Sequence, residues 1–170
     1  LRDETIHLNF GIDLINGNIN SQLKFAQPLV GAPGLVYGEQ AIAVAGYEGV
    51  VYLVSLRPFE CQKVTALGHR PGTIKIPIIS MGKLLLVCEN DRADSALLHV
   101  LDGNGEKASL NELEQYRIKG HVHSMPVLRG KQLFFPTVPE RITAFTVTDE
   151  EGKRKLTEIA SYQLQDPLSC

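Results

Sequence analysis

The apolar residues of this chain gather in short, nearly continuous runs separated by Gly, Pro, Asn and Asp. Clear examples are AIAVA at 41–45, VVYLVS at 50–55 and LLLVC at 84–88. In an amphipathic helix, apolar residues would recur about three to four residues apart, and these runs lack that spacing. Short runs of Val, Ile, Leu and Tyr between turn residues are typical of strands that are buried on both faces. The pattern therefore predicts an all-β protein.

Three segments, 33–55, 77–102 and 126–147, repeat one order of residues. Each opens with Pro and one or two apolar residues, and a turn of Gly and a polar residue follows. One apolar strand, a polar connection and a second apolar strand complete the unit. The prolines that open these units and a partial fourth are Pro33, Pro77, Pro126 and Pro167. Their intervals of 41 to 49 residues, with several short strands per unit, are typical of β-propeller blades.

The pattern continues at both ends of the chain. IDLINGNI at 12–19 resembles the end of an earlier unit, and DPLSC at 166–170 resembles the opening of the next. We therefore predict that residues 1–170 form one domain or part of one, with about three complete four-stranded blades and flanking strands. Because propellers close with about 4–8 blades, we expect a fragment of a larger propeller. Closure as four blades, by joining the first and last strands, and closure with a second copy through open blade edges are the alternatives.

Other folds account for the pattern less well. A β-sandwich also has short strands and frequent turns, but it would not repeat one order of residues at near-constant spacing. A WD-type propeller would pair Gly-His with Trp-Asp in its repeats, and no unit does so. One stretch, SLNELEQYRI at 109–118, differs from the rest, because Ser109 with Glu112 forms the pattern of a capping box. We predict a short helix or turn there, inserted in a blade connection.

The repeats resemble those of pyrroloquinoline-quinone-type propellers, the quinoprotein alcohol dehydrogenase-like family. Segment 77–102 runs through Pro and two apolar residues, Gly-Lys-Leu, a strand and a turn into LLHVLD. The stretches 13–17 and 102–105 match the turn that closes the third strand of that family's blade. Ser55 and Val147 stand where the family has Asp, and the chain has no Trp. The resemblance covers almost the whole chain and implies a propeller fold.

The family includes quinone- and calcium-dependent dehydrogenases and non-enzymatic scaffolds of the outer-membrane assembly type. The dehydrogenase site resembles a chamber with an adjacent Cys pair, a Trp floor and acidic calcium ligands. Here Cys61, Cys88 and Cys170 are far apart. The acidic run Glu-Asn-Asp at 89–91 suggests calcium only superficially, because polar turn residues are expected after an apolar strand. We therefore predict a non-catalytic binding or scaffold module without a cofactor. The alternative is part of an alcohol or sugar dehydrogenase that uses pyrroloquinoline quinone with calcium.

Charge and composition narrow the partners. The formal net charge is -2 and Lys and Arg are scattered, so we expect no nucleic-acid partner. The apolar runs fall far short of the roughly 20 residues of a membrane-spanning helix. No nucleophile-elbow motif, Walker loop or dinucleotide-binding glycine pattern is present, and we assign no catalytic and no metal-binding residue. The expected partner is another protein or the remaining blades of the propeller. The family resemblance implies a periplasmic or other extracytoplasmic location.

The pair His121 and His123 is the best candidate for a ligand-binding site. Counted back from the opening prolines, their counterparts in the other units are Pro28 and Gly72 for His121, and Val30 and Ile74 for His123. The segment leads into the first strand of a blade, which lines the central channel of a propeller. On an extended chain the two side chains share one face. A metal site completed by other blades, a polar contact in the channel and an ordinary exposed pair all fit this pattern.

Two other histidines are placed by the same repeat. His99 lies at the position of Tyr52 in the first unit and, by sequence alignment, of Ala144 in the third. We predict that His99 is a strand residue, packed or half exposed. His69, in Gly-His-Arg-Pro-Gly, is predicted to lie in a loop.

Overall fold

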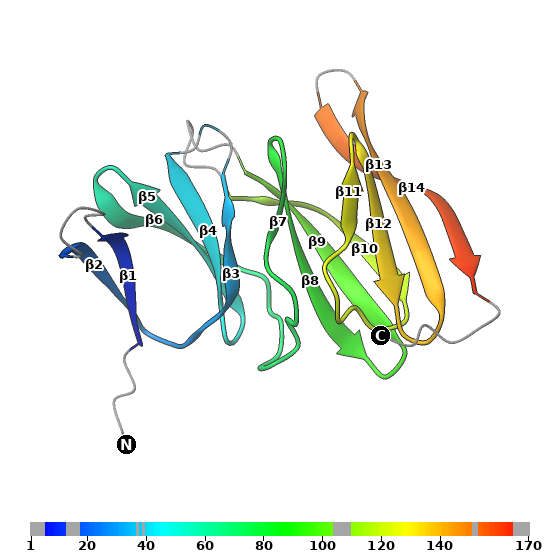
Figure 1. The fold of residues 1–170 in the computed structure, drawn as a ribbon, viewed down its shortest axis with the longest axis horizontal. Coiled ribbons are helices and arrows are strands. Elements are labelled where there is room, and N and C mark those ends of the chain that lie inside the picture. Colours follow the sequence, from blue (N-terminus) through cyan, green and yellow to red (C-terminus); the bar gives the residue numbers. More distant parts are fainter. Residues whose placement is uncertain are drawn as a thin grey trace.

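The computed structural model describes residues 6–12, 18–36, 38, 40–103, 110–150 and 153–164. Within these ranges the chain forms strands and no helix. The strands make four antiparallel sheets that stand side by side in chain order (Figure 1). The first sheet is the hairpin of β1 (Ile6–Ile12) and β2 (Ile19–Phe25). The other three sheets have four strands each, as a propeller blade requires.

We name the four-stranded sheets blades 1, 2 and 3. Blade 1 consists of β3 (Leu29–Leu35), β4 (Ala41–Gly46), β5 (Val50–Leu56) and β6 (Phe59–Ala66). Blade 2 consists of β7 (Ile79–Met81), β8 (Leu84–Arg92), β9 (Ser95–Asp102) and β10 (Glu112–Lys119). Blade 3 consists of β11 (Val127–Arg129), β12 (Gln132–Thr137), β13 (Arg141–Glu150) and β14 (Lys153–Gln163). The strands of each blade pair in sequence order, which confirms the predicted propeller architecture.

The prolines that open the predicted units can be placed relative to the strands of these blades. Pro77 and Pro126 come just before β7 and β11, whereas Pro33 lies inside β3, which begins four residues earlier at Leu29. The β1–β2 hairpin precedes blade 1, and β2 ends at Phe25 rather than near residues 12–19, where an earlier unit was predicted to end. Residues 13–17 and the predicted opening of a further unit at 166–170 lie outside the described residues.

The predicted helix or turn at 109–118 is wrong. Glu112–Lys119 is strand β10, the outermost strand of blade 2, and it pairs antiparallel with β9. Its side chains alternate between exposed and covered, and Ile118 is buried while Tyr116 is partly buried. A capping box describes only the first turn of a helix. The alternation over 113–119 instead suits a strand that pairs with β9 and turns one face toward the core. Ser109 lies outside the described residues.

The core is divided into three layers between successive sheets. Phe25 of β2 meets Tyr52 of blade 1 edge to face, with ring centroids 4.8 Å apart. A second layer, between blades 1 and 2, includes Leu53 and Val87. A third layer, between blades 2 and 3, includes Leu98 and Phe145. Because both faces of the central strands are covered, their sequences are continuously apolar, as the sequence analysis inferred.

Blade 3 has one covered face and one uncovered face. Leu133 and Phe145 point toward blade 2 and are fully buried. The cross-strand partners Val127, Phe134 and Ala144 share the opposite face. Blade 3 is last in the row, so none of the described strands covers this second face (Figure 1). Val127 is accordingly 63% exposed.

Candidate functional site

His121 joins two blades through its main chain and its ring. Its backbone N–H donates to the carbonyl of Val138 at 2.8 Å, and its carbonyl accepts from the Val138 N–H at 2.9 Å. Its imidazole Nε2 lies 2.6 Å from the carbonyl oxygen of Arg92, the last residue of β8. The exposed ring of His123 meets it edge to face, with centroids 5.9 Å apart. His121 therefore ties the end of blade 2 to blade 3, and its Nε2 is occupied by a carbonyl oxygen.

The position of His121 in the repeat is clear from equivalent hydrogen bonds. The N–H of Val138 donates to His121, and in the same way Asn90 donates to Thr73 and Tyr47 donates to Pro28. The structural counterparts of His121 are thus Pro28 and Thr73, whereas counting from the prolines selected Pro28 and Gly72. Counting is one residue wrong in blade 2 because the strands do not begin at a constant distance from the prolines.

Among the described residues, no group of three or more His, Cys, Asp or Glu side chains could hold a metal ion. Ligand binding at His121 and His123 stays a prediction, and their observed contacts serve the blade junction.

His69 has a comparable role at the preceding junction. It lies in a loop, as predicted, within the segment that crosses from blade 1 to blade 2, and it is only 2% exposed. Its Nε2 lies 3.0 Å from the carbonyl oxygen of Gly46, the last residue of β4. Its Nδ1 has no hydrogen-bond partner among the described residues. The ring therefore fills the space between the crossing segment and blade 1.

His99 lies in a buried polar network that the sequence did not reveal. Its Nε2 is 3.1 Å from Oε1 of Glu89 on β8, and its Nδ1 is 2.6 Å from Oε1 of Glu112 on β10. Thr73 donates its hydroxyl to Oε2 of Glu89 at 3.1 Å, and Gln115 donates to Glu112 at 2.9 Å. The side chain of His99 is 1% exposed and that of Glu89 is 7% exposed. Each ring nitrogen lies within hydrogen-bond distance of a carboxylate oxygen, so the network fixes the orientation of the ring and links three strands of blade 2.

The acidic run at 89–91 does not fit a calcium ion. Glu89 bonds to His99, and the amide of Asn90 exchanges two hydrogen bonds with the backbone of Val122. Asp91 accepts from Arg117 Nη1 through both carboxylate oxygens, at 2.8 and 3.0 Å. The Arg117 guanidinium also holds the pKa of Asp91 below its usual value. Because the three side chains serve separate partners, they do not converge as calcium ligands must.

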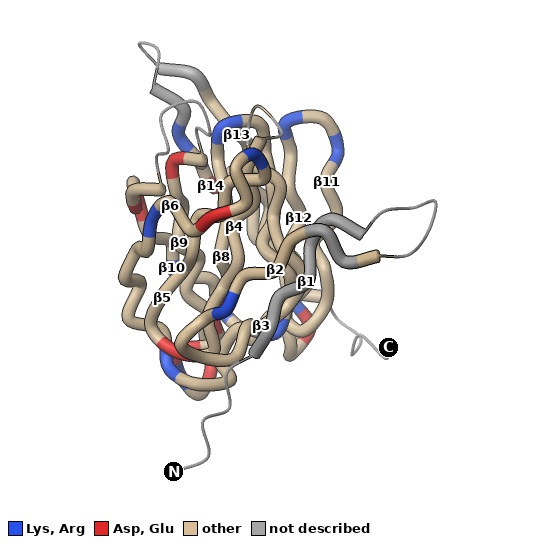
Figure 2. Tube along the Cα trace, turned by 90° about the vertical axis from the view of Figure 1, so that its left-hand side faces the viewer, with Lys and Arg blue, Asp and Glu red and all other residues tan. Residues whose placement is uncertain are grey.

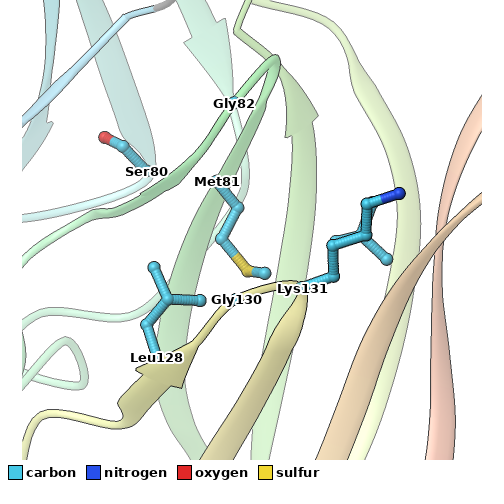
Figure 3. A pocket seen from close by; sticks show the side chains of 7 residues that line it. Ser80, Met81, Gly82, Leu128, Gly130 and Lys131 are labelled. Atoms are coloured by element: carbon cyan, nitrogen blue, oxygen red, sulfur yellow. The ribbon is translucent and has the colours of Figure 1, made fainter.

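A pocket of about 270 Å³ lies at the end of the blades opposite His121. It is formed where the turn Gly82-Lys83 of blade 2 faces the turn Gly130-Lys131 of blade 3. Figure 3 shows Met81, Leu128 and Lys131 around this space. Its full lining is Ser80, Met81, Gly82, Leu128, Gly130, Lys131 and Val147.

The chemistry of this pocket is apolar with one basic group. The Ser80 hydroxyl already donates to the carbonyl of Leu35 at 2.7 Å. No imidazole, carboxyl or thiol group belongs to the lining, so the pocket has no acid, base or nucleophile of the usual kinds. Its volume is below the range of about 300–1,000 Å³ that is typical of small-molecule sites. The geometry suits an inserted apolar side chain.

This pocket was not predicted from the sequence. Both Gly-Lys turns were recognised, but only as turns. Their repetition at equivalent points of neighbouring blades was the available signal, because stacked blades bring equivalent turns together.

The fold is shared with solved propellers. The chain is similar to BamB from Moraxella catarrhalis, with 18% identity and a TM-score of 0.58 over 78% of this chain and 38% of that one. It is similar to the WD40 domain of Toxoplasma gondii coronin, with 10% identity and a TM-score of 0.67 over 91% and 40%. It is also similar to the fission yeast complex of the SREBP and SCAP binding domains, with 16% identity and a TM-score of 0.55 over 95% and 42%.

No family model matches the sequence, and a search of curated proteins finds no match. The structural similarities support a β-propeller, and the more specific quinoprotein-type repeat stays a prediction. The chain spans about two fifths of the length of the solved chains that it resembles.

Proposed function

We propose that this chain is a non-catalytic binding module that recognises another protein at the pocket between the Gly-Lys turns of blades 2 and 3. The observation that carries the proposal is the composition of that pocket. Met81, Leu128 and Val147 supply an apolar lining, and Leu128 is 49% exposed at its edge. An apolar pocket with an exposed apolar residue and a basic group at its edge is typical of protein interaction sites.

The similar structures agree with a binding role. One of them is described as a complex of the SREBP and SCAP binding domains, so a propeller of this shape can take part in a protein complex. Fold similarity alone does not determine function, and the proposal rests on the pocket.

A selection of random peptides displayed on phage tests the proposal. We expect enrichment of peptides whose binding falls about tenfold or more in Leu128→Asp, because a charge at the pocket edge opposes insertion of an apolar side chain. Leu113→Asp is the matched control, since Leu113 is 48% exposed on the outermost strand of blade 2. Circular dichroism checks that both variants fold. The absence of any Leu128-dependent peptide contradicts the proposal.

The dehydrogenase alternative has a direct test. We expect that adding pyrroloquinoline quinone with calcium produces no saturable absorbance change and no dye-linked oxidation of alcohols or sugars. The engaged side chains of Glu89, Asn90 and Asp91 support this expectation. A saturable change together with oxidation would replace the binding function by the enzymatic one.

The uncovered face of blade 3 has a different partner in this proposal, namely a further blade of the same propeller. Its apolar residues include Val127 and Phe134, and the analogous faces of blades 1 and 2 are covered by their neighbours. Without that blade, we expect concentration-dependent self-association in sedimentation equilibrium, reduced by Val127→Lys. A chain that stays monomeric at high concentration contradicts this part. The extracytoplasmic location stays a proposal from the family resemblance.

A further inference from the structure

We infer that the partner segment bound at this pocket is an extended acidic peptide that inserts one apolar side chain. This inference rests on the proposed function and adds the chemical class of the partner. It is carried by the charges at the pocket, by the shape of its lining and by the strand beside it.

The one charged residue in the lining of the pocket is basic. Lys131 belongs to the lining, Lys83 follows Gly82 in the facing turn, and Arg129 precedes Gly130. No Asp or Glu belongs to the lining. Figure 2 shows Lys and Arg positions at the upper end of β11, where the turn Gly130-Lys131 lies. Negative charges on a partner would therefore be attracted to this end of blades 2 and 3.

At the opposite end of blade 2, a cluster of charges around Asp91 is paired within the chain. Arg117 binds both carboxylate oxygens of Asp91, and Arg92 lies 4.0 Å from the same carboxylate. In the described part of the chain, neither Lys131 nor Arg129 has an ion pair. Both side chains belong to exposed residues, so their charges are available to an external carboxylate.

The strand beside the pocket suits an extended partner. β11 pairs with β12 along one edge, and no described strand pairs with its other edge. An extended peptide can lie along such an edge and place alternate side chains on either side of it. On this strand Leu128, which lines the pocket, is 49% exposed. A leucine-like side chain from the peptide would then enter between Met81 and Leu128.

Methyl NMR provides a direct test because the chain has two methionines. Met81 lines the pocket, and Met125 is 50% exposed outside the pocket lining, so it serves as an internal control. The probes are three short peptides: a leucine flanked by glutamates, a leucine flanked by lysines, and a glycine flanked by glutamates. We expect the acidic leucine peptide to shift the Met81 methyl signal with a dissociation constant about fivefold or more below that of the lysine peptide. The glycine peptide should leave the Met81 signal unchanged. Added salt should weaken binding of the acidic leucine peptide.

Charge reversal sharpens the result. Lys131→Glu should abolish the preference for the acidic peptide, whereas Lys119→Glu at the far end of β10 should leave it unchanged. Equal shifts of Met81 with the acidic and basic leucine peptides, or no shift with the acidic one, overturn the inference.

The two levels of the proposal fail in different ways. If the phage selection yields Leu128-dependent peptides that are not acidic, the proposed function stands and this inference falls. If it yields no Leu128-dependent peptide, the proposed function itself is contradicted.

Discussion

The junction between blades 1 and 2 and the junction between blades 2 and 3 have the same backbone geometry and different chemistry. Val87 of β8 pairs with His99, and Phe135 at the equivalent point of β12 pairs with Thr143. Two residues farther along each strand, blade 2 has Glu89 and blade 3 has Thr137. An ionisable pair in one junction thus corresponds to two hydroxyl residues in the other.

The main-chain pairing explains how both versions fit. In each junction, the segment that crosses to the next blade accepts a backbone hydrogen bond from that blade's second strand, at Thr73 or at His121. That bond positions the sheets whichever side chains lie between them. The first junction adds the Thr73 hydroxyl to Glu89, and the second adds the Thr137 hydroxyl to the carbonyl of Lys119 at 2.9 Å. The repeat therefore preserves geometry, and each junction satisfies its own buried polar groups.

The largest effect should come from removing His99. In His99→Leu, the buried Glu89 carboxylate keeps Thr73 but loses its ring partner, and we expect the free energy of unfolding to fall by about 3–5 kcal/mol. Urea denaturation at neutral pH measures this free energy. Thr143→Val, at the equivalent point of blade 3, should change the free energy of unfolding by less than about 1 kcal/mol.

The double variant Glu89→Leu with His99→Leu separates charge from packing. If the uncompensated carboxylate causes the loss, the double variant should recover most of the stability. A double variant as unstable as His99→Leu would mean that shape, and not charge, dominates at this position.

The glycines that precede His121 and His69 also differ between the two junctions. Gly120 has φ +89° and an added Cβ would lie 2.8 Å from the carbonyl oxygen of Val138, whereas Gly68 has φ +75° and open space around it. Gly68→Ala should therefore cost only the left-handed backbone strain, about 1–2 kcal/mol. Gly120→Ala should cost at least about 2 kcal/mol, because the clash is added to the strain. Thermal unfolding of the two variants measures both stability losses. Equal losses would contradict the close approach of the Val138 carbonyl to Gly120.

The thiol of Cys88, in the layer between blades 2 and 3, should make stability depend on alkaline pH. Burial raises the pKa of this thiol from 9.0 to about 12. The folded state thus keeps the proton that the unfolded chain loses above pH 9. Stability should be unaffected by this group below pH 9 and fall by about 1.4 kcal/mol per pH unit between 9 and 12.

Urea denaturation across that range measures the slope, and Cys88→Val should remove this part of it. Cys61→Ser is the control, because Cys61 is exposed and should leave most of the slope in place. A slope that is identical in Cys88→Val and in the wild type would show that the thiol is not protected by folding.

The smallest effect is expected at Thr137. Thr137→Val removes the hydroxyl that donates to Lys119 and keeps the shape of the side chain, so we expect a loss of about 1 kcal/mol. The same urea measurement detects it. A loss of stability as large as that of His99→Leu would mean that the two junctions depend equally on their buried polar groups.

The strands and their grouping could be predicted from sequence because strand burial and turn chemistry are local. Runs such as 41–45 and 84–88 became β4 and β8. Glu112–Lys119 was misassigned because the capping-box pattern is a local signal for a helix. The alternation of exposed and covered side chains in this segment stabilises a strand only because β9 pairs with it. His99 was expected to be packed or half exposed, and sequence alignment took Ala144 as its equivalent in the third unit. The observed pairing places Thr143 there, and Ala144 on the uncovered face.

By itself, the sequence determined an all-β chain with a repeated blade, because apolar runs and Gly, Pro and Asp turns act over a few residues. Only the tertiary structure decided which side chains meet across blades. It brought Glu89 to His99, occupied the ring of His121 with the Arg92 carbonyl, and set two Gly-Lys turns around one pocket. Those contacts depend on strand register, where a shift of one residue moves every side chain to the other face. No local pattern specifies that register, since it follows from packing between sheets.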